Sequence, residues 1–96
     1  MKPLNFVKVE KLRNFFKVLG DDTRMRIILL LQNNPTTVND IARALNMEQS
    51  AISHQLKTLY QQRVVTYKKS GKERIYEIID NHIFEIIAQA SEHIEE

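Results

Sequence analysis

Four side chains near the end of the chain have the chemistry and spacing of metal ligands. Asp80, His82, His93 and Glu96 form the pattern Asp-x-His-x10-His-x-x-Glu, on a segment whose apolar residues recur at helical spacing. Two imidazoles and two carboxylates suit tetrahedral zinc, and also cobalt(II) or nickel(II). The thiolates that copper(I), cadmium and lead prefer are missing, because the chain has no cysteine. The pattern therefore predicts a site for Zn(II), with Co(II) or Ni(II) as alternatives.

A single chain cannot gather all four ligands if residues 80 to 96 form one helix. A rise of about 1.5 Å per residue separates His82 from His93 by roughly 16 Å along the axis. Asp80 and His82 can share one ion at the start of the helix, and His93 and Glu96 can share another at its end. Two copies packed antiparallel through the isoleucines of this helix would join unlike pairs into two equal sites. We therefore expect the metal site to exist only in a homodimer.

The same residues also have ordinary structural interpretations. Asp80 is well suited to cap the helix that it precedes, and Glu96 would then be a solvated charge near the end of the helix. The two histidines would be exposed residues beside the apolar stripe. We favour the metal site because all four residues fit one pattern, on a dimerising helix that follows a candidate DNA-binding motif.

Length and composition predict one domain, residues 1–96, near the size at which a lone core is only marginally stable. Oligomerisation is expected on that ground alone. The longest apolar run, residues 27–31, is too short to span a bilayer, and no apolar leader follows the first residues. We therefore expect a cytoplasmic protein with no membrane partner. The absence of cysteine excludes disulfides and thiol catalysis.

Charge is distributed unevenly along the chain. Residues 43–74 contain seven Lys or Arg and two Glu, whereas residues 75–96 contain six acidic residues and no Lys or Arg. A basic middle predicts a polyanionic partner, and an acidic end predicts a cation.

Apolar residues at helical spacing, together with helix start and stop signals, predict four helices in the first two thirds of the chain. Helices are predicted over residues 7–19, which end at Gly20, and over residues 24–32. Two further helices, 38–45 and 48–62, are joined by the tight turn Asn46-Met47, with Asn46 in a left-handed conformation. Such a closely joined pair is typical of a helix-turn-helix.

The second helix of that pair has one apolar and one polar face. Ile52, Leu56 and Leu59 are predicted to face inward. The outward set is Ser50, Ser53, His54, Gln55 and Lys57. These groups can hydrogen-bond base edges in a major groove or pair with phosphates, which predicts double-stranded DNA as the partner. A solvated polar face is the simpler alternative.

Residues 64–78 alternate as two strands around a Ser-Gly turn, which predicts a β-hairpin. Its basic residues are Lys68, Lys69, Lys72 and Arg74. They could neutralise a phosphate backbone beside the groove that the preceding helix enters. A helix-turn-helix followed by such a hairpin is a winged helix.

Taken together, these motifs resemble the bacterial ArsR/SmtB family of metal-sensing repressors, and within it the zinc-responsive SmtB and CzrA type. The likeness covers nearly the whole chain. It runs through residues 19–24, residues 49–57, the hairpin and the four candidate ligands. It implies a mainly α fold with a small β-hairpin, in the order α-α-α-α-β-β-α, that forms a homodimer through its terminal helices. The family's thiolate site on the helix before the turn is absent, because residues 37–40 carry no cysteine.

The resemblance also implies a function. A metal-free dimer would bind operator DNA and release it when zinc binds, and Gln49 joins the residues expected to contact DNA. In the family a metal-bound histidine donates its second ring nitrogen to a carbonyl at the end of the recognition helix. Matching residue by residue assigns this allosteric relay to His93 and the carbonyl of Arg63.

Two other classes of function remain for comparison. An enzyme is not expected, because four protein ligands would close a zinc site to substrate, and no hydrolase or phosphate-binding motif is present. A winged-helix module that binds DNA or protein with no metal effector is the stronger alternative. Operator binding with and without zinc separates these classes.

Overall fold

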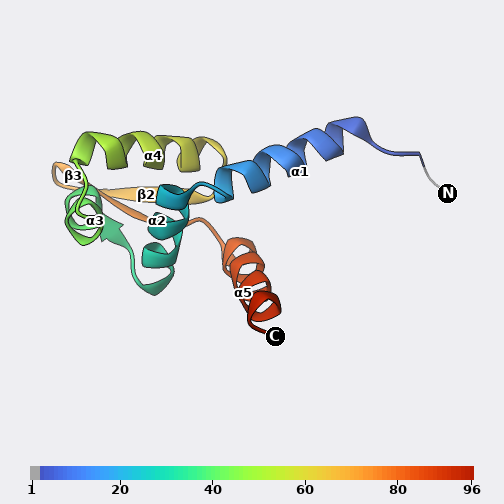
Figure 1. Ribbon diagram of the computed structural model, residues 1–96. Helices are drawn as coiled ribbons and strands as arrows, with labels where there is room; N and C mark the ends of the chain where they lie inside the picture. Colours follow the sequence, from blue (N-terminus) through green and yellow to red (C-terminus); the bar gives the residue numbers. More distant parts are fainter. Residues whose placement is uncertain (1–2) are drawn as a thin grey trace.

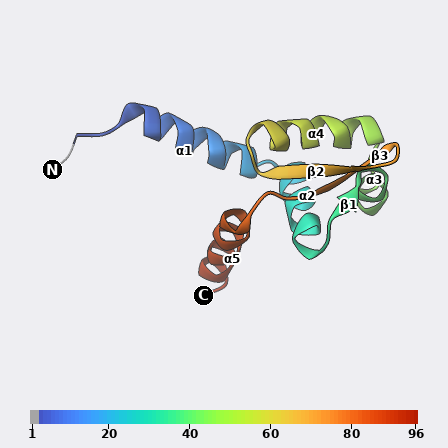
Figure 2. The same cartoon turned by 180° about the vertical axis from the view of Figure 1, so that it is seen from behind.

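The structure is a computed structural model that describes residues 3–96, with helices arranged around a short antiparallel sheet (Figures 1 and 2). The elements are α1 (Phe6–Leu19), α2 (Asp22–Asn33), β1 (Thr36–Thr37), α3 (Val38–Leu45), α4 (Gln49–Gln61), β2 (Val65–Ser70), β3 (Glu73–Ile78) and α5 (Asn81–Glu95). The predicted order of five helices with a hairpin before the last one is confirmed. The winged helix-turn-helix is therefore the fold.

One strand was not predicted. Thr36 and Thr37 form β1, which pairs antiparallel with Tyr76 and Ile75 of β3, so the sheet has the order β1-β3-β2. Thr37 also caps α3, since its side chain accepts from the amide of Asp40 at 3.2 Å. Two residues are too few to show the alternation that identifies a strand. The pairing fixes the start of the helix-turn-helix to the hairpin.

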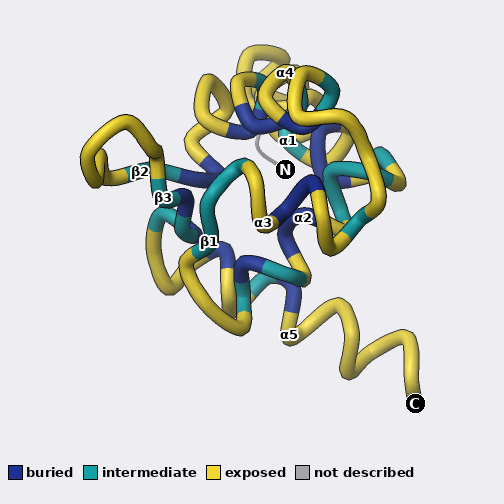
Figure 3. The backbone as a smooth tube through the Cα atoms, turned by 90° about the vertical axis from the view of Figure 1, so that its left-hand side faces the viewer, coloured by how far each residue is buried: buried dark blue, intermediate teal, exposed yellow. Residues whose placement is uncertain are grey.

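The core lies between α2, α3, α4 and the sheet, and the buried tube in Figure 3 follows it through these elements. The side chains with at most 2% exposure are Ile27, Ile28, Leu31, Ile41, Ile52, Leu56, Leu59, Val64 and Val65. The predicted inward stripe of α4 is thereby confirmed, which leaves the opposite side of this helix in solvent.

A left-handed residue follows each of the two helices of the helix-turn-helix. Asn46 has φ 54° and ψ 51°, as predicted, and it turns the chain from α3 into α4. Arg63, with φ 59°, does the same after α4: its amide donates to the Tyr60 carbonyl, and the Val64 amide donates to the Leu59 carbonyl. This pair of bonds is a Schellman motif, which satisfies carbonyls that the helix end would leave unpaired. The exit of α4 into the hairpin is thus well defined.

Both terminal helices project from the body of the protein (Figure 1). Along α1 most apolar side chains are exposed, including Phe6 at 79%. The isoleucine stripe of α5 divides: Ile83 and Ile87 are buried against the chain's own core, whereas Ile94 is 79% exposed. The sequence suggested that the whole stripe would face a second copy, and only its later part is available. Exposed apolar helices of this kind mark an interaction surface.

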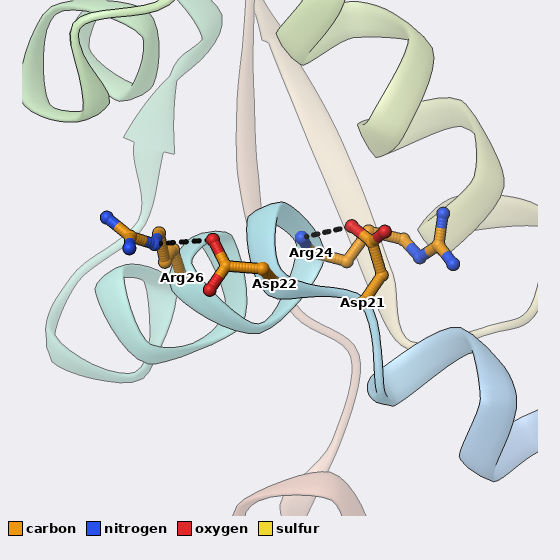
Figure 4. Close-up of polar contacts among 4 residues, drawn as sticks. All are labelled: Asp21, Asp22, Arg24 and Arg26. Atoms are coloured by element: carbon orange, nitrogen blue, oxygen red, sulfur yellow. Dashed lines mark hydrogen bonds and ion pairs between the residues drawn. The ribbon is translucent and has the colours of Figure 1, made fainter.

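The start of α2 offers a matched test of helix capping (Figure 4). Asp21 accepts from the amide of Arg24 at 3.1 Å, whereas Asp22 makes an exposed ion pair with Arg26 at 2.8 Å. Asp21→Ala should lower the free energy of unfolding by about 1 kcal/mol, because the amide loses its partner. Asp22→Ala removes the same charge and should cost only about 0.3 to 0.5 kcal/mol. Urea unfolding at one protein concentration measures both, and equal losses would contradict the assignment of the cap.

Candidate nucleic-acid interface and metal centre

The solvent side of α4 carries most of the predicted DNA-contacting residues. Five of the predicted DNA-contacting residues on α4 are exposed: Gln49, Ser50, Ser53, His54 and Lys57. They lie on the side of α4 opposite the buried stripe, because the side chains on one face of an α-helix recur only every 3.6 residues. Their amide, hydroxyl, imidazole and ammonium groups can meet base edges and phosphates.

Gln55 is the exception, and the prediction that it faces outward is wrong. It is half-buried, and its Oε1 accepts from Nη1 of Arg24 at 3.0 Å. Nε of Arg24 also donates to the carbonyl of Val18 at 2.8 Å. Gln55 follows the buried Ile52 by three residues, which places it at the border of the apolar stripe. It therefore links α4 to α2 and to the end of α1, and its expected contact with DNA stays a prediction.

The hairpin separates its cations onto two faces. Strand alternation and the pairings of Lys69 with Arg74 and of Tyr67 with Tyr76 place these four residues on one face. Lys68 lies on the other face, where its Nζ is 3.8 Å from the Glu77 carboxylate. The remaining cation, Lys72, follows Gly71, whose φ of 63° forms the turn. Only one face of the hairpin is therefore directed toward α4.

A groove of about 800 Å³ runs between α4 and the hairpin, a feature that the sequence did not predict. Its wall on α4 includes Lys57 and Tyr60, and its wall on the hairpin includes Tyr67, Arg74 and Tyr76. The ring centroids of Tyr60 and Tyr67 are 5.2 Å apart, and those of Tyr67 and Tyr76 are 5.3 Å apart. Pairing across the Ser-Gly turn could have placed Tyr67 beside Tyr76, but the approach of Tyr60 needed the tertiary structure.

Arg74 completes this aromatic stack. Its Cζ lies 4.5 Å from the centroid of Tyr67, within the range of a cation–π interaction. Contact with the Tyr76 side chain, and secondarily the neighbouring Tyr67, raises the pKa of Arg74 above its ordinary value. The guanidinium is cationic like that of any arginine, and its contact with Tyr67 holds it at the groove.

The first candidate ligand pair lies at the start of α5. Asp80 caps this helix, since its Oδ1 accepts from the amide of Ile83 at 3.3 Å, while its Oδ2 lies 3.2 Å from Nδ1 of His82. The bond with His82 lowers the pKa of Asp80, so this carboxylate is ionised at neutral pH. The His82 side chain is 85% exposed. Carboxylate and imidazole are thus already adjacent and accessible, as a shared ion would require.

The second pair, His93 and Glu96, lies exposed at the other end of α5. One continuous helix between the pairs keeps them apart, as the predicted rise requires. In residues 3–96 of one chain, no three His, Asp or Glu side chains are close enough to hold a metal ion. The structure therefore brings Asp80 to His82 but does not bring the two pairs together within one chain.

The predicted relay joins α5 to the end of α4. The carbonyls of Leu59, Tyr60 and Val64 each accept a backbone amide, whereas within residues 3–96 no hydrogen bond reaches the carbonyl of Arg63. In the same described part of one chain, none links His93 to Arg63. The relay stays a prediction.

Sequence comparisons identify known proteins that are similar to this chain. Residues 21–67 match the family described as bacterial regulatory protein, arsR family. The chain is 33% identical to a Synechocystis transcriptional repressor SmtB homolog, over 93% of this chain and 67% of that protein. It is 32% identical to the HTH-type transcriptional regulator NmtR of Mycobacterium tuberculosis, over 97% of this chain and 78% of the relative.

Solved structures have the same fold. A homodimeric winged helix-turn-helix DNA-binding domain from Mycobacterium bovis superposes with a TM-score of 0.87, at 20% identity, over 99% of this chain and 91% of that one.

In the described residues no helix is long and apolar enough to cross a membrane.

Proposed function

This chain belongs to the ArsR family of bacterial regulatory proteins, within the metal-responsive ArsR/SmtB type of transcriptional repressor, and we propose that zinc is its effector. The relatives are transcriptional regulators, which agrees with the prediction that the protein is not an enzyme. In this proposal a metal-free homodimer binds operator DNA in the cytoplasm and is released when zinc binds between the α5 helices of two chains.

DNA binding would use the exposed side of α4 and the hairpin. Gln49, Ser50, Ser53 and His54 are proposed to meet base edges in the major groove, where amide, hydroxyl and imidazole groups can read hydrogen-bond patterns. The proposed phosphate contacts come from Lys57, Lys68, Lys69, Lys72 and Arg74. Phosphate contacts supply affinity and fix the register of the protein on the duplex without reading its sequence.

The homodimer is proposed on the two projecting helices. Exposed apolar side chains on α1, such as Phe6 and Phe16, together with Ile94 on α5, are costly to leave in water. The similar Mycobacterium bovis domain is homodimeric. Pairing two chains would cover these side chains and place two α4 helices on one duplex.

The observation that carries the metal proposal is the arrangement of donors on α5. Asp80 and His82 are in contact at one end of the helix, and His93 and Glu96 are exposed at the other. An antiparallel partner helix would complete each pair with its complement. All four donors are oxygen or nitrogen atoms, a set that fits zinc and also Co(II) or Ni(II). A bound ion would supply positive charge that holds two chains in one relative position.

Transmission to the DNA-binding side is proposed to pass from His93 to Arg63. When one ring nitrogen of a histidine is a ligand, the other carries a proton and usually donates to a fixed acceptor. The carbonyl of Arg63 lies where α4 turns into the hairpin. A bond there would bias the position of the recognition helix.

A winged-helix DNA-binding module with no metal effector is the second candidate. It is favoured by one contact, because Asp80 already serves as the cap of α5 and bonds His82 without any ion. In that case His93 and Glu96 would be solvated charges with no regulatory role.

Zinc should weaken binding to the operator by about 5- to 150-fold, the usual range of allosteric coupling. Duplexes selected from a random pool by the metal-free protein provide the operator, and gel shifts with and without zinc measure the change. His82→Ala should bind the same duplex but lose the zinc response. An unchanged affinity in saturating zinc would favour the module without an effector.

A further inference from the structure

The joint between α1 and the rest of the chain is short. Gly20 and Asp21 separate α1 from α2, and the buried residues of α1 are Val18 and Leu19, at its end. The earlier part of α1 projects away from the body of the protein (Figure 1). The direction of α1 therefore depends on the contacts that its last turn makes.

The side chain of Arg24, in the first turn of α2, contacts both neighbouring helices. Its Nε donates to the carbonyl of Val18 on α1 at 2.8 Å, and its Nη1 donates to Oε1 of Gln55 on α4 at 3.0 Å. The carbonyls in the last turn of a helix lack partners within it, and the helix dipole favours a cation there. A guanidinium suits this position because its planar fork holds several donors in fixed directions. We call this pair of bonds the Arg24 bridge.

The Arg24 bridge differs from the other polar contacts of these helices. Among residues 3–96, no other side-chain hydrogen bond joins α1 or α4 to another helix. The base of the bridge is itself fixed, because the amide of Arg24 donates to Asp21 at 3.1 Å. Arg26, on the same helix, extends in the other direction and pairs with the exposed Asp22 (Figure 4). Arg26 therefore provides a matched control for Arg24.

In a homodimer the angle between α1 and α4 has a consequence for DNA binding. If the α1 helices take part in the contact between chains, this angle sets the separation of the two α4 helices. Two such helices reach successive major grooves when they lie one turn of DNA apart, about 34 to 36 Å. A change of angle at the joint would therefore change the spacing of half-sites that the dimer fits.

We propose that Arg24 is a positioning residue that fixes α4 relative to α1, and that it thereby determines the half-site spacing that the repressor accepts. The proposal rests on the proposed homodimer and its binding to operator DNA. Arg24 acts through Val18 and Gln55, and it need not touch DNA itself.

The first test measures the distance between the two α4 helices without DNA. The chain has no cysteine, so Gln62→Cys places one spin label at the exposed end of α4 in each chain. Double electron–electron resonance then gives the distribution of label distances in the metal-free dimer. Arg24→Gln should broaden this distribution, whereas Arg26→Gln, which removes the same charge from the same helix, should leave it unchanged. Equal distributions for the two variants would overturn the proposal.

A label on α1 provides the internal control. Glu10 is exposed, and the distribution for labels at Glu10→Cys should be the same in the wild type, Arg24→Gln and Arg26→Gln. If Arg24→Gln broadens this distribution as well, the substitution loosens the contact between chains, and the proposed role of Arg24 is wrong.

Two further variants test the fork of the guanidinium. Gln55→Ala removes the acceptor on α4, so it should broaden the distribution for labels at Gln62→Cys about as much as Arg24→Gln does, and the double variant should broaden it no further. Arg24→Lys keeps the charge but lacks the planar fork, so it should broaden the distribution too. Additive effects, or a lysine variant that matches the wild type, would contradict the bridge. These variants keep the test open if thermal unfolding shows that Arg24→Gln does not fold.

The second test measures tolerance for half-site spacing. Each base pair inserted between the half-sites of the selected operator shifts one of them by about 3.4 Å and rotates it by about 35°. The wild type and Arg26→Gln should lose about 10-fold or more in affinity for one inserted base pair, because the base contacts of one half-site are misplaced. Arg24→Gln should lose about threefold or less, since its α4 helices can adjust to the new spacing.

The ratio of two affinities of one protein does not depend on its folded fraction, so lower stability alone would leave the spacing penalty unchanged. A penalty for Arg24→Gln that equals that of the wild type would overturn the proposal.

The proposed function and the proposed role of Arg24 fail in different ways. If the wild type is a monomer, or selects no duplex with two half-sites, the proposed function is wrong. If it is a dimer on paired half-sites, and Arg24→Gln keeps both the distance distribution and the spacing penalty of the wild type, only the positioning role of Arg24 is wrong.

Discussion

Dimers of His82→Ala and dimers of His93→Ala should each bind zinc poorly, whereas a mixture of the two chains should recover one tight site in every heterodimer. In the heterodimer, Asp80 and His82 of the His93→Ala chain meet His93 and Glu96 of the His82→Ala chain. The other site of the same heterodimer lacks both histidines. Competition with a chromophoric chelator, after mixing and subunit exchange, measures the number of tight sites.

The expected effect is large because the change removes a ligand. Loss of a group that merely hydrogen-bonds a ligand already costs 10- to 100-fold in metal affinity in typical sites, so loss of a ligand should cost more. A cobalt(II) absorption spectrum gives a second measurement: intense visible bands indicate a tetrahedral site, and they should return on mixing.

A matched mixture tests whether the ligands come from two chains. His93→Ala and Glu96→Ala damage the same donor pair, so neither site in their heterodimer is complete, and mixing should recover nothing. If this mixture recovers a tight site as well as the first one does, or if neither recovers any, the interchain arrangement is contradicted.

Much of the fold follows from local signals in the sequence. The bounds of α3 were predicted as residues 38–45 and are observed there, since the Thr37 cap and the left-handed Asn46 mark its two ends. The hairpin followed from alternation around a Ser-Gly turn, and Gly71 has the positive φ that this turn requires. Each of these signals lies within a few residues of the structure that it determines.

Contacts between segments that are distant in the sequence could not be predicted from local signals. The bond from Arg24 to Gln55 spans 31 residues, and it ties a residue that was predicted to face outward to a neighbouring helix. β1 depends on a partner strand far along the chain. The groove needs Tyr60 from α4 and Tyr67 from β2 at once, and neither spacing alone predicts it.

The candidate metal site likewise has one part that follows from local sequence and one part that depends on distant groups. The adjacency of Asp80 and His82 is local, and the structure contains it. The joining of this pair to His93 and Glu96 depends on a second chain, so it rests on helix geometry and on the exposed apolar surface of α1 and α5. That is why a mixing experiment, rather than any single variant, is the informative test.

Replacing His93 by Glu should separate zinc binding from DNA release. A carboxylate can still bind the ion, but it has no second N–H to donate to the carbonyl of Arg63. The variant should therefore keep measurable zinc affinity while zinc no longer weakens its binding to the operator, a loss of about 1 to 3 kcal/mol of coupling. Zinc titrations of the free and DNA-bound variant give this coupling directly, because operator DNA and zinc must weaken each other by the same factor.

His82→Glu is the matched control, since it makes the same exchange of ligand at the other pair and leaves His93 intact. This variant should retain the coupling even if its zinc affinity falls. If His93→Glu binds zinc and still releases the operator as fully as the wild type does, the path from His93 to Arg63 is wrong. If both variants lose release together, the response follows the ligand set, and the second ring nitrogen of His93 has no special part in it.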